Sequence, residues 1–451
     1  MRQAADDRCE VLVVGAGPAG SACAQWLARH GVDVLLADQH DFPRDKTCGD
    51  GLIPDAHAAL RRLGVHEEVM DLAQRVTDVR CVAPSGRHVD VPGMLAVLPR
   101  RELDHLLVRA AQRAGARLLT PWRFEAALRS ADGRVEGARL RAFGTTAGAA
   151  PAADEGGDTG VTPGADQAPA PRPQREVRAR HVVLATGAAP QALIAAGLCQ
   201  RRAPSAMGLR GYIRPARPEP ALQGLHGRLE VFWHRRLKPG YGWIFPCPGG
   251  VYNIGVGIID SHRARPDGRA AMRALNLREV FDDFARLHAP ARALVEGGTW
   301  VGRLEGAPLR SSLQGARCAA PGILVAGEAA GSTYSFTGEG IGKAMETGLL
   351  AAEALLDARA RGGAKDTGDG TGDDDHALQS DYLARLARLK PKFDLYERGN
   401  TVNHHPWLTE LLVRRAAASP GVRRRMADLL EERATPAQLI TLRGVFKLFT
   451  T

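Results

Sequence analysis

The chain has 451 residues and seven scattered cysteines without a C-x-x-C pair, which fits a reducing compartment and argues against a disulfide framework, an iron–sulfur cluster or another metal site. It has no run of 18 apolar residues and no room for a signal peptide before its first expected strand, so we expect a cytoplasmic protein without a membrane span. The net charge of +10 is dispersed arginine, which argues against nucleic acid as a partner but leaves peripheral contact with an anionic inner-membrane surface open.

A glycine-rich turn directly after a short apolar strand is the strongest local signal. Residues 11–20 read VLVVGAGPAG, a β-branched run that leads into G-x-G-x-x-G. The first glycine permits the sharp turn, the second lets the backbone approach a pyrophosphate, and the third lets the next helix pack closely. The helix expected over about residues 19–30 turns its N-terminal amides toward those phosphates. The predicted contacts are Gly15, Gly17, Pro18, Ala19 and Gly20.

Asp38 follows the next expected strand, over residues 32–37. A carboxylate at this place accepts a hydrogen bond from an adenosine ribose hydroxyl. No arginine follows directly, so a 2′-phosphate is not favoured there. Strand, turn, helix, strand and acid therefore predict a dinucleotide site, and the alternative is an ordinary βαβ turn whose glycines serve packing.

The middle of the chain alternates between core-forming and core-poor stretches. Residues 144–174 are rich in Ala, Gly and Pro and predict a disordered surface insertion, and residues 361–375 predict a linker. Residues 182–186 (VVLAT) predict a further buried strand of the nucleotide-binding sheet. Residues 207–260 show short alternating strands with turn signals, which predict an antiparallel sheet.

A second glycine-rich stretch follows an apolar strand far down the chain. Residues 323–342 read ILVAGEAAGSTYSFTGEGIG. A cofactor held by both ends of one chain must be long, and FAD is long. Beyond it, the tail shows helical periodicity with apolar residues opposite arginines such as Arg414 and Arg424. Such basic helices rest on a membrane or pack on their own domain, and we favour packing.

With both ends in view, the chain resembles the FAD-dependent geranylgeranyl reductase family, within the wider aromatic-hydroxylase-like flavoprotein superfamily. The matching motifs are VLVVGAGPAG at 11–20, FPRDKTCGDGL at 42–52, PRRELD at 99–104, ATG at 185–187, GYGWIFP at 240–246, GEAAG at 327–331 and TGEGI at 337–341. Cys48-Gly49 together with Y-x-W-x-F-P points to this family over its neighbours.

The order of elements predicts an α/β fold with a Rossmann-type, glutathione-reductase-like FAD-binding domain built from discontinuous segments. We assign residues 1–75, 100–200 and 318–360 to that domain, residues 76–99 and 201–317 to an inserted antiparallel-sheet substrate domain, and residues 376–451 to a helical C-terminal region. We expect a monomer.

The resemblance also implies roles in cofactor binding. Glu328 takes the place of an acid that binds the ribityl chain, where the superfamily more often has Asp, and Thr337–Ile341 would bring backbone amides to the flavin edge that gains charge on reduction. Arg101 looks like the arginine that contacts FAD, with Arg100 as a fallback. The alternatives are a surface acid and a solvated helix charge. The remaining implied contacts are Lys46, Gly187, Gly338, Gly340 and Ile341.

The implied reaction is reduction of C=C bonds in a prenyl chain by hydride transfer from reduced FAD, with a hydrophobic small molecule or prenyl lipid as substrate. Tyr241, Trp243 and Phe245 alternate along one strand, so their rings would share a face and wall an apolar substrate channel, unless they are ordinary core. The catalytic candidates are Cys48, Tyr241 and Trp243. Cys48 would relay a proton or tune the flavin, although a buried, inert cysteine is a common alternative.

Two other functions stay open at this point: an FAD-dependent monooxygenase or halogenase acting on an aromatic or carrier-bound substrate, and a non-catalytic flavin-binding redox partner. Aromatic hydroxylases carry Asp-Gly where this chain has Thr186-Gly187, and halogenases carry W-x-W-x-I-P where it has Tyr241 and Phe245. Both departures favour the reductase. The external reductant, NAD(P)H or ferredoxin, stays undetermined.

Overall fold

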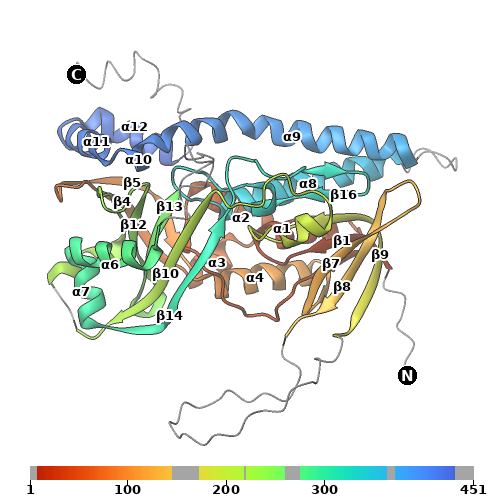
Figure 1. Ribbon diagram of the computed structural model, residues 1–451, viewed down its shortest axis with the longest axis horizontal. Helices are drawn as coiled ribbons and strands as arrows, with labels where there is room; N and C mark the ends of the chain where they lie inside the picture. The colour runs from red at the N-terminus through yellow and green to blue at the C-terminus, as the bar shows by residue number, and fades with distance from the viewer. Residues whose placement is uncertain (1–7, 145–171, 218–219, 260–274, 363–370, 432–451) are drawn as a thin grey trace, which may run out of the picture.

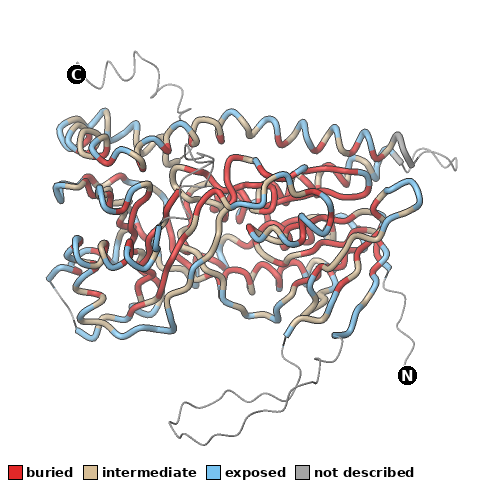
Figure 2. The backbone as a smooth tube through the Cα atoms, in the orientation of Figure 1, coloured by how far each residue is buried: buried red, intermediate tan, exposed pale blue. Residues whose placement is uncertain are grey.

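The computed structural model describes residues 8–144, 172–217, 220–259, 275–362 and 371–431 (Figure 1). The predicted insertion over 144–174 lies almost wholly outside these residues, as does the end of the tail from residue 432. Within the described residues the strands form two sheets of eight strands each. The buried residues concentrate in these two sheets and in the helices packed on them (Figure 2).

The first sheet, sheet A, has the strand order β15-β16-β9-β1-β2-β6, with β8 paired to β9 and β7 to β8. Its strands are β1 (Arg8–Val14), β2 (Val34–Ala37), β6 (Arg117–Leu119), β7 (Trp122–Arg129), β8 (Val135–Ala142), β9 (Gln174–Leu184), β15 (Ala319–Ala320) and β16 (Ile323–Val325). β1 runs parallel to β2 and β9, and β9 parallel to β16. The predicted strand over 182–186 is the end of β9. This arrangement confirms the Rossmann-type fold class.

Helices cover sheet A. α1 (Pro18–Arg29) packs between α4 (Arg100–Arg113) and α8 (Ile341–Gly362). The core strands β2 and β16 are continuously apolar, as is β1 from Val11 onward, because residues on both of their faces are buried, as expected for parallel strands. The shorter helices of this half are α2 (Pro54–Leu63), α3 (His66–Leu72) and α5 (Gln191–Ala195).

The second sheet, sheet B, has the strand order β14-β10-β13-β12-β11-β4-β5-β3. Its strands are β3 (Gly51–Leu52), β4 (Gln74–Val82), β5 (His88–Val97), β10 (Ala206–Pro215), β11 (Arg228–Phe232), β12 (Gly240–Cys247), β13 (Val251–Ile259) and β14 (Gly298–Leu309). The pairing is antiparallel as predicted, except that β11 runs parallel to β4. β3 joins this sheet from a segment that we assigned to the FAD-binding domain.

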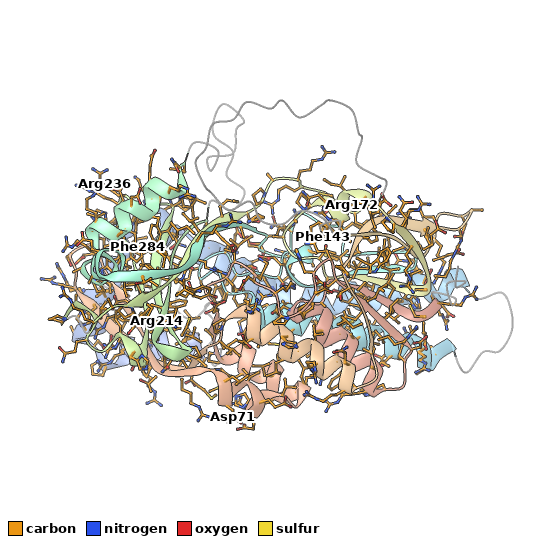
Figure 3. All side chains as sticks on the ribbon, turned by 90° about the horizontal axis from the view of Figure 1, so that it is seen from below. Asp71, Phe143, Arg172, Arg214, Arg236 and Phe284 are labelled. Carbon is orange, nitrogen blue, oxygen red and sulfur yellow. The ribbon has the colours of Figure 1, made fainter. Side chains whose placement is uncertain are left out.

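Helices α6 (Leu277–Leu287) and α7 (Ala289–Gly297) cover one face of sheet B. Phe284 of α6 is fully buried there, and its ring fills the space where a side chain on Gly242 would lie. Phe284 lies toward one end of the elongated molecule and Phe143 on the other side of its middle (Figure 3). Strands β7, β8 and β9 of sheet A lie at the end opposite to β10 and β14 of sheet B (Figure 1). The two sheets therefore mark its two halves.

The C-terminal helices join the two halves. α9 (Thr371–Gly399) runs along the length of the molecule, and α10 (Thr401–His404), α11 (Pro406–Ala418) and α12 (Pro420–Leu430) lie over β4, β5 and β12 (Figure 1). The predicted linker over 361–375 is too long, because α9 already begins at Thr371 and buried Asp375 pairs with Arg134 at 2.6 Å. No helix within the described residues is long and apolar enough to cross a membrane.

Candidate cofactor and active site

The glycine turn between β1 and α1 has the tight geometry that the motif predicts. A Cβ on Gly15 (φ +100°) would lie 2.3 Å from the Ala185 carbonyl oxygen, and one on Gly20 would lie 1.8 Å from the Gly15 oxygen. Neither position can carry a side chain. Gly17 is different, because a Cβ there would meet only two guanidinium nitrogens, of Arg100 at 3.7 Å and Arg44 at 3.8 Å. Two positive charges and the α1 N-terminus thus face one open space, which suits a pyrophosphate.

A buried carboxylate fixes these two guanidiniums. Arg100 donates two hydrogen bonds to Asp104, at 2.7 and 2.8 Å, and Arg44 donates a third at 3.0 Å. Asp104 is fully buried. Burial alone lowers the pKa of the Arg100 guanidinium, but the charge and hydrogen bonds of Asp104 outweigh it and, together with the Cys48 side chain, raise that pKa. Arg100 therefore stays charged beside Gly17.

Arg101, our first choice for the FAD-contacting arginine, lies elsewhere. Its side chain is 48% exposed and its guanidinium is 3.9 Å from Asp45. It does not line the cavity into which Gly17 faces, whereas Arg100 does. The fallback residue Arg100 thus fits the role, and the placement of Arg101 does not support it.

Asp38 stands at the end of β2, as predicted, with both carboxylate oxygens held by the backbone. One oxygen accepts from the Ala16 N–H at 2.7 Å and the other from the His40 N–H at 2.9 Å. Arg44 lies 3.6 Å away. The carboxylate is thereby fixed at the rim of the glycine turn, where a ribose hydroxyl would lie.

The second glycine-rich stretch packs against the start of α1, where a Cβ on Gly327 would lie 2.6 Å from the Cβ of Ala19. Glu328 accepts a hydrogen bond from the Thr333 hydroxyl at 3.2 Å, and Tyr241 donates its O–H to the Thr337 carbonyl. The hydroxyl oxygens of Thr337 and Thr186 are buried but have no hydrogen-bond partner among the described residues, and both residues line the cavity. Buried polar atoms without partners are costly, so they fit a site that a polar ligand completes. Thr186 and Thr337, together with the open space that Gly17, Arg44 and Arg100 face, fit FAD.

One continuous cavity of about 560 Å³ connects these parts. Its lining includes every predicted cofactor, catalytic and substrate residue except Gly20, which packs beneath the turn, and Arg101. Lys46, Gly187, Gly338, Gly340 and Ile341 are thus brought together with the two motifs. Their individual roles stay predictions.

The aromatic residues of β12 form one wall of this cavity. The ring centroids of Tyr241 and Trp243 are 6.4 Å apart, as are those of Trp243 and Phe245. The predicted shared face is therefore present. Trp233, which the sequence analysis did not single out, extends the wall at 5.8 Å from Tyr241, and its indole N–H donates to Asn403 of α10 at 2.8 Å.

A buried carboxyl group behind the Cys48 loop was also missed. Asp50 is fully buried and accepts hydrogen bonds from the Tyr212 hydroxyl at 2.5 Å and the Asn253 amide at 2.7 Å. The same Asn253 amide donates to the Cys48 carbonyl at 2.8 Å, and its oxygen accepts from the Trp243 indole at 2.9 Å. Asn253 thus ties the loop to the aromatic wall. In the sequence, the signal for this buried carboxyl group is an acidic residue two positions beyond Cys48.

Burial raises the pKa of Asp50 from the usual 3.8 to about 6, although hydrogen bonds from Tyr212 and Asn253 and the charges of Arg210 and Arg100 oppose the shift. Because the folded state binds this proton more tightly than the unfolded chain, the Asp50 contribution lowers the free energy of unfolding as pH rises from about 4 to about 6.

The Asp50→Asn variant should lose this pH dependence. We expect the free energy of unfolding of the variant, relative to wild type, to rise by about 2 kcal/mol between pH 4.5 and 7.5. Denaturant titrations at both pH values measure it, with exposed Asp71→Asn as the matched control. Parallel pH profiles of Asp50→Asn and wild type would show that Asp50 ionises as it does in the unfolded chain.

Within the described residues, no group of three His, Cys, Asp or Glu side chains is placed to hold a metal ion.

Comparison with known proteins agrees with an FAD-binding site. Residues 8–147 match the FAD binding domain family. The chain is 32% identical over 357 residues to the menaquinone reductase of Mycolicibacterium smegmatis, covering 77% of this chain and 76% of that protein. It is 33% identical over 366 residues to the menaquinone reductase of Mycobacterium tuberculosis, covering 78% of each. It is 28% identical over 351 residues to digeranylgeranylglycerophospholipid reductase 2 of Methanopyrus kandleri, covering 77% of each.

Solved structures share the fold. A geranylgeranyl bacteriochlorophyll reductase-like protein from Thermoplasma acidophilum superimposes with a TM-score of 0.70 at 19% identity, over 99% of this chain and 96% of that one. A flavin-dependent brominase superimposes with a TM-score of 0.66 at 16% identity, over 98% of each. At these identities the likeness concerns the fold alone. The identity and coverage of the mycobacterial relatives, however, show that the chain belongs to the FAD-dependent geranylgeranyl reductase family.

Proposed function

We propose that this protein is an FAD-dependent reductase that saturates C=C bonds in the prenyl chain of a quinone or lipid. The observation that carries the proposal is the single cavity that joins a dinucleotide-type turn to an apolar aromatic wall. The relatives support it, because menaquinone and a digeranylgeranylglycerophospholipid have different head groups and share a polyprenyl chain. The shared chemistry is therefore in the chain and not in the head group.

The residues of the two motifs would hold FAD along the cavity. Gly17, Arg44 and Arg100 would face the pyrophosphate, Asp38 would bind the adenosine end, and the Thr337–Ile341 backbone would face the isoalloxazine end. When bound, FAD supplies the hydride for the reduction.

The remaining task of the protein is to orient the alkene and deliver a proton. Tyr241, Trp243 and Phe245 hold the chain and exclude water, which gives proximity to the reacting bond. An unactivated trisubstituted alkene is a poor electrophile, so the proton must arrive at or before the hydride. Cys48 is half-buried in the cavity wall beside the Arg100 guanidinium, and we assign the proton transfer to its thiol.

The direct test is anaerobic turnover of the FAD-loaded protein with dithionite, which makes the physiological donor irrelevant. Menaquinone, a digeranylgeranylglycerophospholipid and geranylgeranyl diphosphate are offered in turn, and products are read by mass spectrometry. After reoxidation of any quinone head group in air, we expect a gain of two hydrogen atoms per reduced bond. In D₂O both should be deuterium, because dithionite supplies only electrons and reduced flavin takes its hydrogen from solvent. Oxygen-dependent hydroxylation or halogenation of an aromatic compound, without prenyl reduction, would instead support the monooxygenase or halogenase. Trials with NADH, NADPH and reduced ferredoxin then identify the donor.

A further inference from the structure

The cavity continues beyond the aromatic wall into an apolar arm whose floor is one face of sheet B. The strand register carries this floor from Trp243 on β12 to Val231 on β11 and Cys81 on β4. A second row beside it consists of Leu229, Val79 and Val91. Except for the Cys81 thiol and the Trp243 indole, the floor is hydrocarbon. At about 4.8 Å per strand, the three steps from β12 to β5 span roughly 14 Å.

Helices α11 and α12 form the roof of this arm. Val413 and Ala416 of α11 are buried against Val89 and Val91 of β5. The roof residues that line the cavity are Thr409, Leu412, Val413, Met426, Leu429 and Leu430. Among these roof residues, Thr409 alone carries a polar side-chain group, its hydroxyl. The arm therefore suits a hydrocarbon and not a charged head group.

Leu430 stands at the far end of the arm, over β5. A Cβ on Gly93 of β5 would lie 2.8 Å from a methyl carbon of Leu430, so the missing side chain at Gly93 lets Leu430 reach the sheet. Leu430 also packs against two groups of buried residues, one that includes Leu95 and Val97 and one that includes Val89 and Val91. Met426 lies one helical turn earlier on the same face of α12 and lines the same arm.

Building on the proposed function, we propose that Leu430 and Met426 close the apolar arm and set how much prenyl chain can lie beyond the double bond at the aromatic wall. The occupant of the arm is the hydrocarbon tail of the substrate. A chain that ends before Leu430 leaves apolar surface uncovered, and a longer chain meets the side chain of Leu430. Chain-length preference is therefore a property of α12.

The test measures binding of geraniol, farnesol, geranylgeraniol and a longer prenyl alcohol to the full chain by native mass spectrometry, independently of turnover. In wild type, Kd should fall with each added isoprene unit until the arm is filled. Leu430→Trp should raise Kd for the longest chain that wild type accepts by roughly tenfold or more and leave farnesol within twofold. Leu430→Ala should allow one further unit to add affinity.

Met426→Phe adds bulk one turn earlier and gives the same test if Leu430→Trp does not fold. Leu383→Trp, on α9 at 45% exposure, is the matched control and should bind like wild type. Flavin absorbance and thermal unfolding check the fold of each variant. Prenyl alcohols that bind with the same length cut-off in wild type, Leu430→Trp, Leu430→Ala and Met426→Phe would overturn the role of α12 and leave the proposed function intact. Failure of wild type to bind any prenyl alcohol would overturn the substrate class itself.

Discussion

Arg100→Met should weaken FAD binding by at least tenfold and lower the free energy of unfolding by about 3 kcal/mol. The variant removes one of the two positive charges beside Gly17 and leaves Asp104 fully buried with Arg44 as its partner. Removing one member of a buried ion pair costs more than the pair contributes, because the remaining charge keeps its desolvation penalty. Fluorescence titration of the apoprotein with FAD measures the first effect, and denaturant unfolding of the apoprotein measures the second.

Arg101→Met is the matched control, because it makes the same chemical change one residue away. The Arg101 side chain is 48% exposed, so we expect a stability change within about 0.5 kcal/mol and unchanged FAD affinity. Loss of FAD affinity in Arg101→Met with unchanged affinity in Arg100→Met would return the role to Arg101. The double variant Arg100→Met/Asp104→Leu separates the two effects, since it should recover stability without recovering FAD affinity.

Cys48→Ala should keep FAD and lose prenyl reduction by a factor of about 10² to 10⁴, the range for removal of a general acid. Cys48 lies in the cavity wall, and its backbone carbonyl is held by Asn253. The loop should therefore keep its position when the thiol is removed. Single-turnover assays with dithionite-reduced protein separate this chemical step from electron supply.

Cys318→Ala controls for the loss of a thiol elsewhere. Burial raises the pKa of the Cys318 thiol to about 11, and this residue belongs to the core of sheet A and not to the cavity lining. We expect full turnover from this variant. Unaltered turnover by Cys48→Ala would remove Cys48 from the mechanism and direct attention to the Asp50–Tyr212 pair behind it.

The parts of the site that the sequence predicted well are those in which one short segment fixes its own geometry. The G-x-G-x-x-G turn is such a segment, because the close contacts at Gly15 and Gly20 arise from the motif itself and its adjoining strands. The shared face of Tyr241, Trp243 and Phe245 likewise follows from strand alternation.

The choice between Arg100 and Arg101 could not be made in this way. Both lie within reach of Asp104 along a helix, at spacings of four and three residues. Only the packing of α4 against the glycine turn decides which guanidinium faces the cavity. That packing depends on residues far apart in the chain, including Arg44, which shares Asp104 with Arg100.

The network around Asp50 was out of reach for the same reason. It joins a loop, α4, β10 and β13, and its members Tyr212 and Asn253 are neighbours only through the register of sheet B. The tail shows a related limit. Its periodicity predicted amphipathic helices, but an apolar helix face does not tell what covers it, and the cavity beneath α11 and α12 became visible only in three dimensions.

Helix α9 and the residue that follows it are hydrogen-bonded to both halves of the molecule. The Tyr382 hydroxyl donates to the Val325 carbonyl of β16 at 2.7 Å, and Asn400, directly after the helix, donates to the Ile259 carbonyl of β13 at 3.3 Å. These two hydrogen bonds hold α9 to both sheets and oppose separation of the two halves along this helix. If the proposed substrate is correct, we therefore expect its hydrocarbon chain to enter the cavity end-first, with the free tip of the chain leading.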